Sequence, residues 1–269
     1  MRLVRYRHQG HEGVGIETEA GVSPTRFDDM IELIESGETP EPTGDPVTPE
    51  RILAPIARPR KIFGSGVNFR SHQEENPEAV LPTQPGFFSK LPSSVVGTGD
   101  AIVVPTPEQL VDYEVEVVIV VGAAARRVSR ERALEHVFGY AVVNDVSARD
   151  LQFAGDIVLG KGLDTFCPLG PAIVTVDELG DASNLELATY VNGEQLQQGN
   201  TDDWLFDVGT IIEFLSSYVT LEAGDVITTG TPAGVAAFRD PAPYLRPGDE
   251  VTVEVSGIGR LTNPVVAGW

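Results

Sequence analysis

The amino-acid sequence predicts a strand-dominated α+β protein. Its 269 residues include 28 Gly and 20 Pro, which divide the chain into many short apolar runs of strand length. Helical spacing of apolar side chains is clearest in only two segments of the larger part of the chain, 129–135 and 210–218. Many strands and few helices favour a strand-rich domain over a doubly wound sheet.

The first fifty residues are expected to form a small module. Residues 1–22 alternate between polar and apolar side chains around glycine-rich turns, which predicts short antiparallel strands. Residues 26–36 predict a helix with Gly37 as its C-cap. The Pro-rich acidic stretch that follows is typical of a linker, so we place a boundary at about residue 50. Residues 51–269 are then expected to form one larger domain.

That larger domain consists of apolar runs that end at turn residues. We expect strands at 61–67, 87–90, 101–103, 114–121, 138–144, 172–175, 186–191, 225–229 and 250–255. The two helical segments lie between these runs.

Composition restricts the partners and the location of the protein. A net charge of −21 disfavours nucleic acid and anionic membranes as partners. No apolar run reaches the roughly 18 residues that span a bilayer, and the first residues lack the apolar block of a signal peptide. We therefore expect a cytoplasmic protein. The single Cys167 lies between apolar neighbours and is expected to be a buried, inert thiol.

Two glutamates begin the most apolar of the predicted strands. Glu114 and Glu116 are two residues apart, so in a strand they project from the same face, about 7 Å from each other. Two carboxylates that face one buried space repel each other unless a cation compensates them. The residues alone leave two interpretations open, a cation site and a strand end in water.

A third carboxylate, Asp145, stands where the next apolar strand ends. Three carboxylates with water suit Mg²⁺, Mn²⁺ or Ca²⁺, and the scarcity of His and Cys disfavours Zn²⁺. The alternative is that Asp145 caps the turn that follows it.

His72 and Glu75 follow the strand expected at 61–67. If residues 70–76 are helical, these two side chains share one face and can form a hydrogen bond. An imidazole oriented by a carboxylate is a general base that can activate water. The alternative is an ordinary surface histidine.

Two further segments offer groups that could bind an anion. Lys161 lies between two glycines that allow a ligand to approach the backbone, and its ammonium could stabilise an enolate or a carboxylate. The spacing of a phosphate-binding loop is missing. The loop that contains Thr231 could receive a carboxylate, although any tight turn has a similar composition.

Taken in order, these segments resemble the fumarylacetoacetate hydrolase family in its smaller prokaryotic form. The resemblance runs from about Pro59 to Val266. Its motifs are Gly-x-Asn-aromatic-x-x-His72, Phe88-Ser-Lys90, Tyr113-Glu-Val-Glu116, Gly139-Tyr140 through Asn144-Asp145 to Gln152, Gly160-Lys161, Val191-Asn192-Gly193-Glu194, and the Gly-Asp-x-Ile-x-Thr-Gly-Thr-Pro-x-Gly-Val stretch around Thr231. Seven motifs in one order make a specific match.

The resemblance implies a mixed β-roll domain, homodimeric and with one Mg²⁺ or Mn²⁺, preceded by the small N-terminal module that many members carry. Ca²⁺ could replace the natural ion in a crystal. The family's functional residues fall on the metal carboxylates Glu114, Glu116 and Asp145, the catalytic dyad His72 and Glu75, the active-site lysine Lys161, the ligand-facing Arg149 and Gln152, and the carboxylate-receiving Thr231.

The function implied by the resemblance is metal-dependent cleavage of a carbon–carbon bond by hydrolysis, through an enolate, in a small 2-oxo acid or 1,3-dicarbonyl. We rank hydrolysis first because the His72–Glu75 pair is present. Decarboxylation of oxaloacetate and isomerisation or hydration of a dienoate use the same site and are alternatives, and a non-catalytic Ca²⁺-binding β-module is a remote one. The segment from Gln152 to Lys161 is shorter than in true fumarylacetoacetate hydrolases, which argues against fumarylacetoacetate itself as the substrate.

Overall fold

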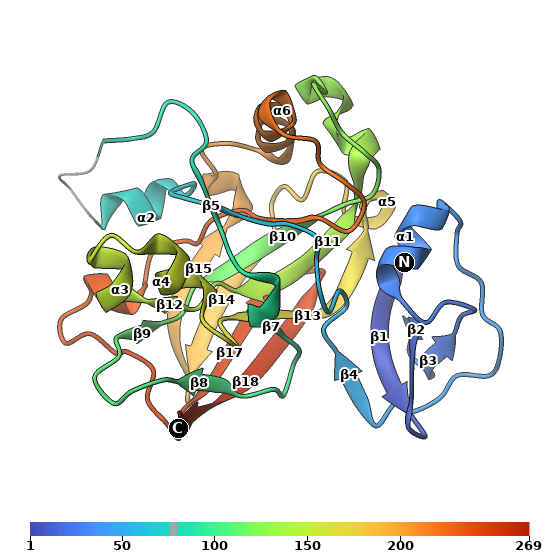
Figure 1. Cartoon of the computed structure of the whole chain (residues 1–269), viewed down its shortest axis with the longest axis horizontal. Coiled ribbons are helices and arrows are strands. Elements are labelled where there is room, and N and C mark those ends of the chain that lie inside the picture. Colours follow the sequence, from blue (N-terminus) through green and yellow to red (C-terminus); the bar gives the residue numbers. More distant parts are fainter. Residues whose placement is uncertain (76–79, 269) are drawn as a thin grey trace.

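A computed structural model describes residues 1–75 and 80–268 of the chain, and strands dominate it (Figure 1). Within these residues the largest sheet has eleven strands. Nine of them lie in the order β3 (Gly21–Pro24), β2 (His11–Thr18), β1 (Arg2–His8), β13 (Cys167–Thr175), β11 (Val137–Asn144), β10 (Val115–Val121), β16 (Val226–Thr228), β5 (Ile62–Ser65) and β6 (Phe87–Ser89). The other two are β4 (Arg51–Leu53), which pairs with β1, and β7 (Val95–Val96), which pairs with β13.

A second sheet has five strands, in the order β15 (Glu194–Asn200), β14 (Glu186–Val191), β17 (Glu250–Val255), β18 (Gly259–Ala267) and β8 (Ile102–Val104). The short strands β9 (Val111–Asp112) and β12 (Ser147–Ala148) form a ribbon of their own. The helices are short: α1 (Met30–Ser36), α2 (Arg70–Glu74), α3 (Arg149–Phe153), α4 (Ile157–Gly162), α5 (Val176–Leu179) and α6 (Val208–Tyr218), with 3₁₀ turns η1 (Pro92–Ser94), η2 (Arg130–His136), η3 (Thr201–Asp203) and η4 (Ala236–Phe238). None of the described helices combines the length and the apolar character needed to cross a membrane.

Strands β10 and β11 form the centre of the larger sheet and pair antiparallel, with Val115 opposite Asn144. Every residue of β10 is buried. Val117 and Ile119 pack into one apolar cluster, whereas Val118 and Val120 pack into another, because both faces of the sheet are covered. This two-sided burial explains the continuous apolar run, and it confines polar side chains to the ends of the strands.

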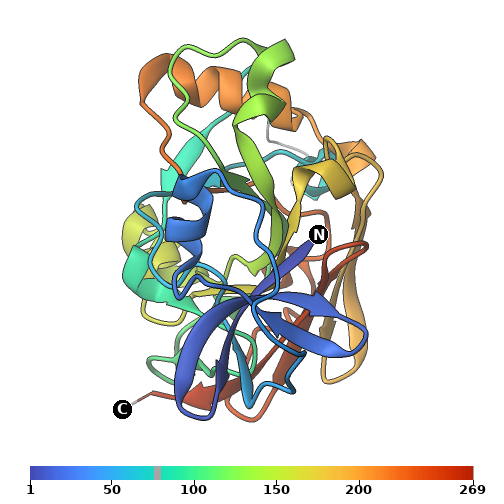
Figure 2. The same ribbon diagram turned by 90° about the vertical axis from the view of Figure 1, so that its right-hand side faces the viewer.

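The N-terminal strands extend the larger sheet, since β1 pairs antiparallel with β13 and places Leu3 opposite Ile173. Figure 2 views the molecule from this side, with α1 in front of the sheet. Leu33 of α1 belongs to the same apolar cluster as Val118 of β10. The boundary at about residue 50 therefore stays a prediction, because the sheet and the core continue across it.

The predicted strand-dominated fold class is confirmed. Each of the nine expected strands is present, and Gly37 is the C-cap of α1 with a φ of 65°. The segment expected as a helix over 129–135 is the 3₁₀ turn η2. Strands β15 and β18 were not predicted, because the former has a single apolar residue, Leu196, and the latter contains Pro264.

Candidate active site

Three carboxylates meet where β10 begins and β11 ends. The pairing of these strands brings Glu114 and Asp145 together, and the amide of Asp145 donates to the carbonyl of Glu114 at 2.8 Å. Carboxylate oxygens of Glu114, Glu116 and Asp145 all lie within 4.8 Å of one another. The three residues are 5%, 1% and 0% exposed. The alternative of a strand end in water is therefore wrong.

The capping alternative for Asp145 is also wrong, because the N-cap of the next helix, α3, is Ala148. The Asp145 carboxylate instead accepts hydrogen bonds from two buried lysines. Lys90 Nζ lies 2.5 Å from one of its oxygens and Lys161 Nζ lies 2.9 Å from the other. Lys161 also donates to Glu114 at 2.7 Å. The two ammonium groups thus neutralise part of the charge of the cluster.

Glu114 and Glu116 differ in their electrostatic surroundings. Burial tends to raise the pKa of Glu114, but Lys161 and Arg149 outweigh burial and lower the pKa to about 2. For Glu116, burial and then the charges of Asp145 and Glu114 raise the pKa well above its usual value. Glu116 accepts a hydrogen bond from the neutral amide of Gly230 at 2.6 Å. The cluster therefore has one carboxylate that the lysines do not neutralise.

This arrangement fits a divalent metal ion. Glu114, Glu116 and Asp145 supply three carboxylates, which suit Mg²⁺ or Mn²⁺ and also accept Ca²⁺. A bound dication would remove the repulsion that raises the pKa of Glu116, so the burial of three acidic groups has a physical reason. The identity of the ion stays a prediction.

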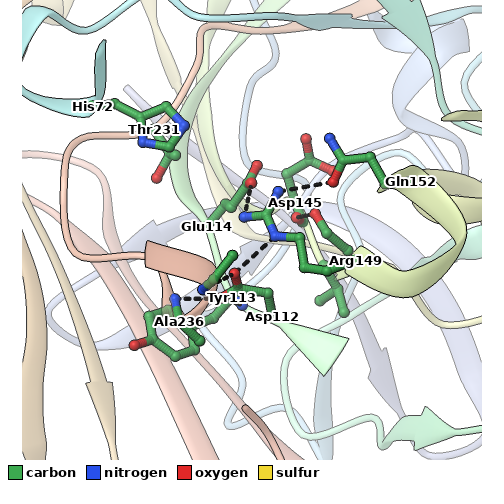
Figure 3. A network of polar contacts seen from close by, with 12 residues as sticks. His72, Asp112, Tyr113, Glu114, Asp145, Arg149, Gln152, Thr231 and Ala236 are labelled. Atoms are coloured by element: carbon green, nitrogen blue, oxygen red, sulfur yellow. Dashed lines mark hydrogen bonds and ion pairs between the residues drawn. The ribbon is translucent and has the colours of Figure 1, made fainter. Parts of the chain in front are cut away.

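Arg149 connects this cluster to the neighbouring loop (Figure 3). Its guanidinium donates to Asp112 at 2.8 Å, to Glu114 at 2.5 Å and to Gln152 at 2.8 Å. Asp112 is completely buried and also accepts the backbone amides of Tyr113, Ala236 and Ala237. This network positions Glu114 and Gln152 and fixes the η4 turn beside them.

A cavity of about 200 Å³ opens onto the cluster. Its lining includes seven of the nine residues predicted for the site, namely His72, Glu114, Glu116, Arg149, Gln152, Lys161 and Thr231. The other two contact members of this set, since Asp145 binds Lys161 and Glu75 binds His72. Phe88 also lines the cavity, and the ammonium of Lys161 lies 5.1 Å from the centre of its ring. The structure therefore brings all nine residues into one place, while their individual roles stay predictions.

The condition that residues 70–76 be helical is met over Arg70–Glu74, which form α2, whereas residues 76–79 lie outside the described part of the chain. Nδ1 of His72 lies 2.6 Å from Glu75. The other carboxylate oxygen of Glu75 accepts the amide of Gly234 at 2.8 Å. The two side chains are only 14% and 15% exposed. This contact excludes a freely exposed surface histidine and joins α2 to the loop of Thr231.

Cys167 is buried, as predicted. Burial raises the pKa of its thiol to about 12, which leaves almost no thiolate at neutral pH. Its role as a nucleophile is therefore disfavoured.

Three buried polar residues around the site were missed. Lys90 was named only as part of a family motif. The chain has just three lysines, and this rarity could have marked Lys90 as a candidate site residue. Asp112 stands two residues before Glu114, and the alternation 112, 114, 116 could have revealed it. Gln197, which donates to Thr231 at 2.8 Å, gave no signal, because its inward orientation depends on an irregularity of β15.

Comparison with known proteins agrees with this geometry. Residues 61–266 match the family model described as the fumarylacetoacetate (FAA) hydrolase C-terminal domain. A human mitochondrial oxaloacetate tautomerase is 40% identical, over 99% of this chain and 92% of its own length.

Two solved structures cover almost the whole fold. A fumarylacetoacetate hydrolase from psychrophilic Exiguobacterium antarcticum superimposes with a TM-score of 0.90 at 40% identity, over 99% of both chains. A 5-carboxymethyl-2-hydroxymuconate delta-isomerase from Mycobacterium smegmatis gives a TM-score of 0.84 at 36% identity, over 99% of this chain and 100% of that chain. With its family model, its fold and its carboxylate cluster in agreement, the chain belongs to the fumarylacetoacetate hydrolase family of enzymes.

Proposed function

We propose that this chain is a divalent-metal-dependent enzyme that interconverts the enol and keto forms of a small 2-oxo diacid of the oxaloacetate type. The observation that carries the proposal is the cavity of about 200 Å³, in which a carboxylate cluster faces an ammonium, an imidazole and a hydroxyl. A tautomerase at 40% identity and an isomerase at 36% identity support it, while a fumarylacetoacetate hydrolase at 40% identity keeps hydrolysis as the second candidate. Tautomerisation and isomerisation both move a proton without breaking a carbon–carbon bond.

Glu114, Glu116 and Asp145 would hold the ion, either Mg²⁺ or Mn²⁺. When bound, this ion supplies Lewis-acid stabilisation of the negative charge that develops on the substrate oxygens.

Lys161 supplies a second positive charge beside the same cavity. Burial tends to lower the pKa of its ammonium, but Asp145 and Glu114 outweigh burial and raise it. In the metal-free protein these two carboxylates therefore favour the ammonium form of Lys161. Its ammonium is buried beside the cavity, where it can stabilise an enolate oxygen.

His72 is the group that can move a proton. The Glu75 carboxylate accepts a hydrogen bond from Nδ1 of His72, so Nδ1 carries the hydrogen. Nε2 is then the ring nitrogen that can accept a proton and return it. In tautomerisation His72 would move one proton between the carbon next to the 2-oxo group and the enolate oxygen, and Glu75 would hold the imidazole in the productive tautomer.

Arg149 and Thr231 can receive the carboxylates of the substrate. Within residues 1–75 and 80–268 Arg149 uses three of its five N–H donors, on Asp112, Glu114 and Gln152, so two remain for a ligand. A rigid guanidinium with two unused donors suits a carboxylate. These contacts favour a diacid over a monoacid.

Hydrolysis of a carbon–carbon bond is the second candidate, and the His72–Glu75 hydrogen bond favours it. The same base could remove a proton from water instead of from carbon. Decarboxylation of oxaloacetate does not require His72 to remove a proton, either from carbon or from water.

The test uses metal-stripped protein reloaded with Mg²⁺ or Mn²⁺ and three assays: loss of the ultraviolet absorbance of enol-oxaloacetate, release of pyruvate from oxaloacetate, and cleavage of acylpyruvates. We expect the first to be fastest and to require the metal. His72→Ala should slow it by roughly 10²- to 10⁴-fold, the range of general acid–base catalysis. Metal-dependent cleavage of acylpyruvates without enol–keto conversion would overturn the proposal in favour of hydrolysis. The homodimer also stays a proposal, which light scattering of the same sample tests.

A further inference from the structure

Gln197 lies on β15, where a β-bulge turns its side chain inward. In the pairing of β14 with β15, Thr189 lies opposite Gln197 and Tyr190 opposite Gln195, so Leu196 has no partner across the ladder. A bulge of this kind interrupts the alternation of side chains. Leu196 and Gln197 are consequently both buried, at 6% and 1% exposure. The amide of Gln197 can then reach both the start of β10 and the loop after β16.

The side-chain amide of Gln197 makes four hydrogen bonds. Its oxygen accepts from the backbone amide of Val115 at 3.1 Å and from the hydroxyl of Thr189 at 2.7 Å. Its nitrogen donates to the hydroxyl of Thr231 at 2.8 Å and to the carbonyl of Pro232 at 2.9 Å. A backbone N–H can only donate and a carbonyl can only accept. Val115 and Pro232 therefore fix the orientation of the amide, and the Thr231 oxygen has to accept.

The hydroxyl of Thr231 has one hydrogen, and this hydrogen cannot point towards the nitrogen of Gln197. Within residues 1–75 and 80–268 the hydroxyl donates to no protein acceptor. Thr231 lines the cavity together with Lys161 and His72, whereas Gln197 does not reach it. The free O–H of Thr231 is thus a donor at the cavity wall, and it selects an acceptor oxygen of the ligand.

We propose that Gln197 is a positioning residue that makes Thr231 a fixed hydrogen-bond donor to a carboxylate of the substrate. The inference rests on the proposed function in taking an anionic 2-oxo diacid as the ligand. The bond from Gln197 to Val115 adds a second effect, because Val115 lies between Glu114 and Glu116. Through this bond the Thr231 donor is held in register with the metal carboxylates.

A double-mutant cycle tests this coupling, with oxalate as the probe and Mg²⁺-loaded protein in the calorimeter. Gln197→Glu keeps the shape of the side chain but puts an oxygen in place of the nitrogen. Facing the Pro232 carbonyl, this oxygen carries the proton of the neutral acid, and Thr231 would donate its hydrogen to the same oxygen instead of donating to the ligand. We expect Gln197→Glu and Thr231→Val each to weaken oxalate binding about tenfold, the effect of losing one hydrogen bond to a charged group. The double variant should also lose about tenfold, because Gln197 acts only through Thr231.

Two control variants separate positioning from general damage. Thr189→Val removes another hydrogen bond of the same amide without touching Thr231, so it should bind oxalate within about twofold of wild type. Thr231→Ser keeps the hydroxyl and should recover most of the affinity that Thr231→Val loses. If Gln197→Glu does not fold, Gln197→Met gives the same cycle with a smaller loss of about threefold, because the Thr231 hydroxyl then rotates freely.

A loss of about a hundredfold in the double variant would overturn the proposal, since additive effects mean independent roles. Wild-type affinity in Gln197→Glu would overturn it as well. Oxalate binding needs no turnover, so the cycle stays informative if enol–keto conversion is absent. In that case the proposed function fails and the role of Gln197 stands.

Discussion

Asp112 and Glu116 are two buried carboxylates four residues apart, and their surroundings are opposite. Asp112 accepts four hydrogen bonds, three from backbone amides and one from the guanidinium of Arg149. For Glu116, by contrast, burial and then the like charges of Asp145 and Glu114 raise the pKa well above the usual value. A carboxylate whose charge is balanced within the protein holds loops together. One whose charge is not balanced provides a place for a cation.

The largest effect is expected from Glu116→Gln. This substitution removes one metal oxygen, so metal-dependent turnover should fall at least about a hundredfold, because Lewis-acid stabilisation is worth several kcal/mol. At neutral pH the metal-free wild type must either bear a like charge at Glu116 or bind a proton there, and Gln avoids both costs. The metal-free variant should therefore melt above the metal-free wild type, by roughly 2–4 °C for each kcal/mol of cost removed.

Calorimetric titration with Mn²⁺ and thermal melts with and without Mg²⁺ measure both effects of Glu116→Gln. Glu186→Gln, at an exposed position on β14, is the control and should match wild type in both. Mn²⁺ binding as tight as in wild type would refute the role assigned to Glu116.

Asp112→Asn should give the reverse result, a large loss of stability with a smaller loss of metal affinity. The new amide cannot balance the charge of Arg149, and its NH₂ group opposes backbone amides that also donate. Breaking a buried ion pair at one partner costs about 3–5 kcal/mol. Unfolding in urea measures this loss in the free energy of unfolding.

The matched control for Asp112→Asn is Asp150→Asn on α3. Among the described residues the Asp150 carboxylate accepts only neutral donors, the side chain of Gln109 and the amide of Leu110, so about 1–2 kcal/mol should be lost. Equal losses in the free energy of unfolding of the two variants would mean that the ion pair with Arg149 stabilises the fold no more than the neutral hydrogen bonds of Asp150 do.

The same contrast explains how much of the molecule the sequence could predict. Apolar runs and glycine-rich turns predict most strands, because a strand that is buried on both faces of a sheet needs a continuous run of apolar residues, as in β10. The family motifs predict the residues that line the cavity. The positions of Glu114, Glu116 and Asp145 follow from strand ends, which the sequence marks clearly.

The supporting residues could not be predicted in this way, because their roles depend on contacts between distant segments. Asp112 accepts hydrogen bonds from the amides of η4, and this role becomes visible only when the fold places η4 beside β9. Lys90 looks like an ordinary lysine until β6 brings it beside Asp145. Gln197 needs the bulge of β15, which no short-range pattern encodes. Residues that contact a ligand belong to recognisable sequence motifs, whereas the residues that position them can be identified only in the structure.

The smallest effect is expected at Gly230, whose amide donates to Glu116. Gly230 has a φ of +84°, and an added Cβ would lie 2.9 Å from Cβ of Asn68, which is itself buried. Gly10 has a similar φ of +77° but no neighbour within 4 Å, so Gly10→Ala reports backbone strain alone, about 1 kcal/mol. Gly230→Ala adds a clash that must displace the amide, so Mn²⁺ affinity should fall about tenfold, in the range found when support of a metal ligand is lost. Equal Mn²⁺ affinity in the two variants would show that Glu116 does not need this amide to bind the ion, and that its place is determined by β10 alone.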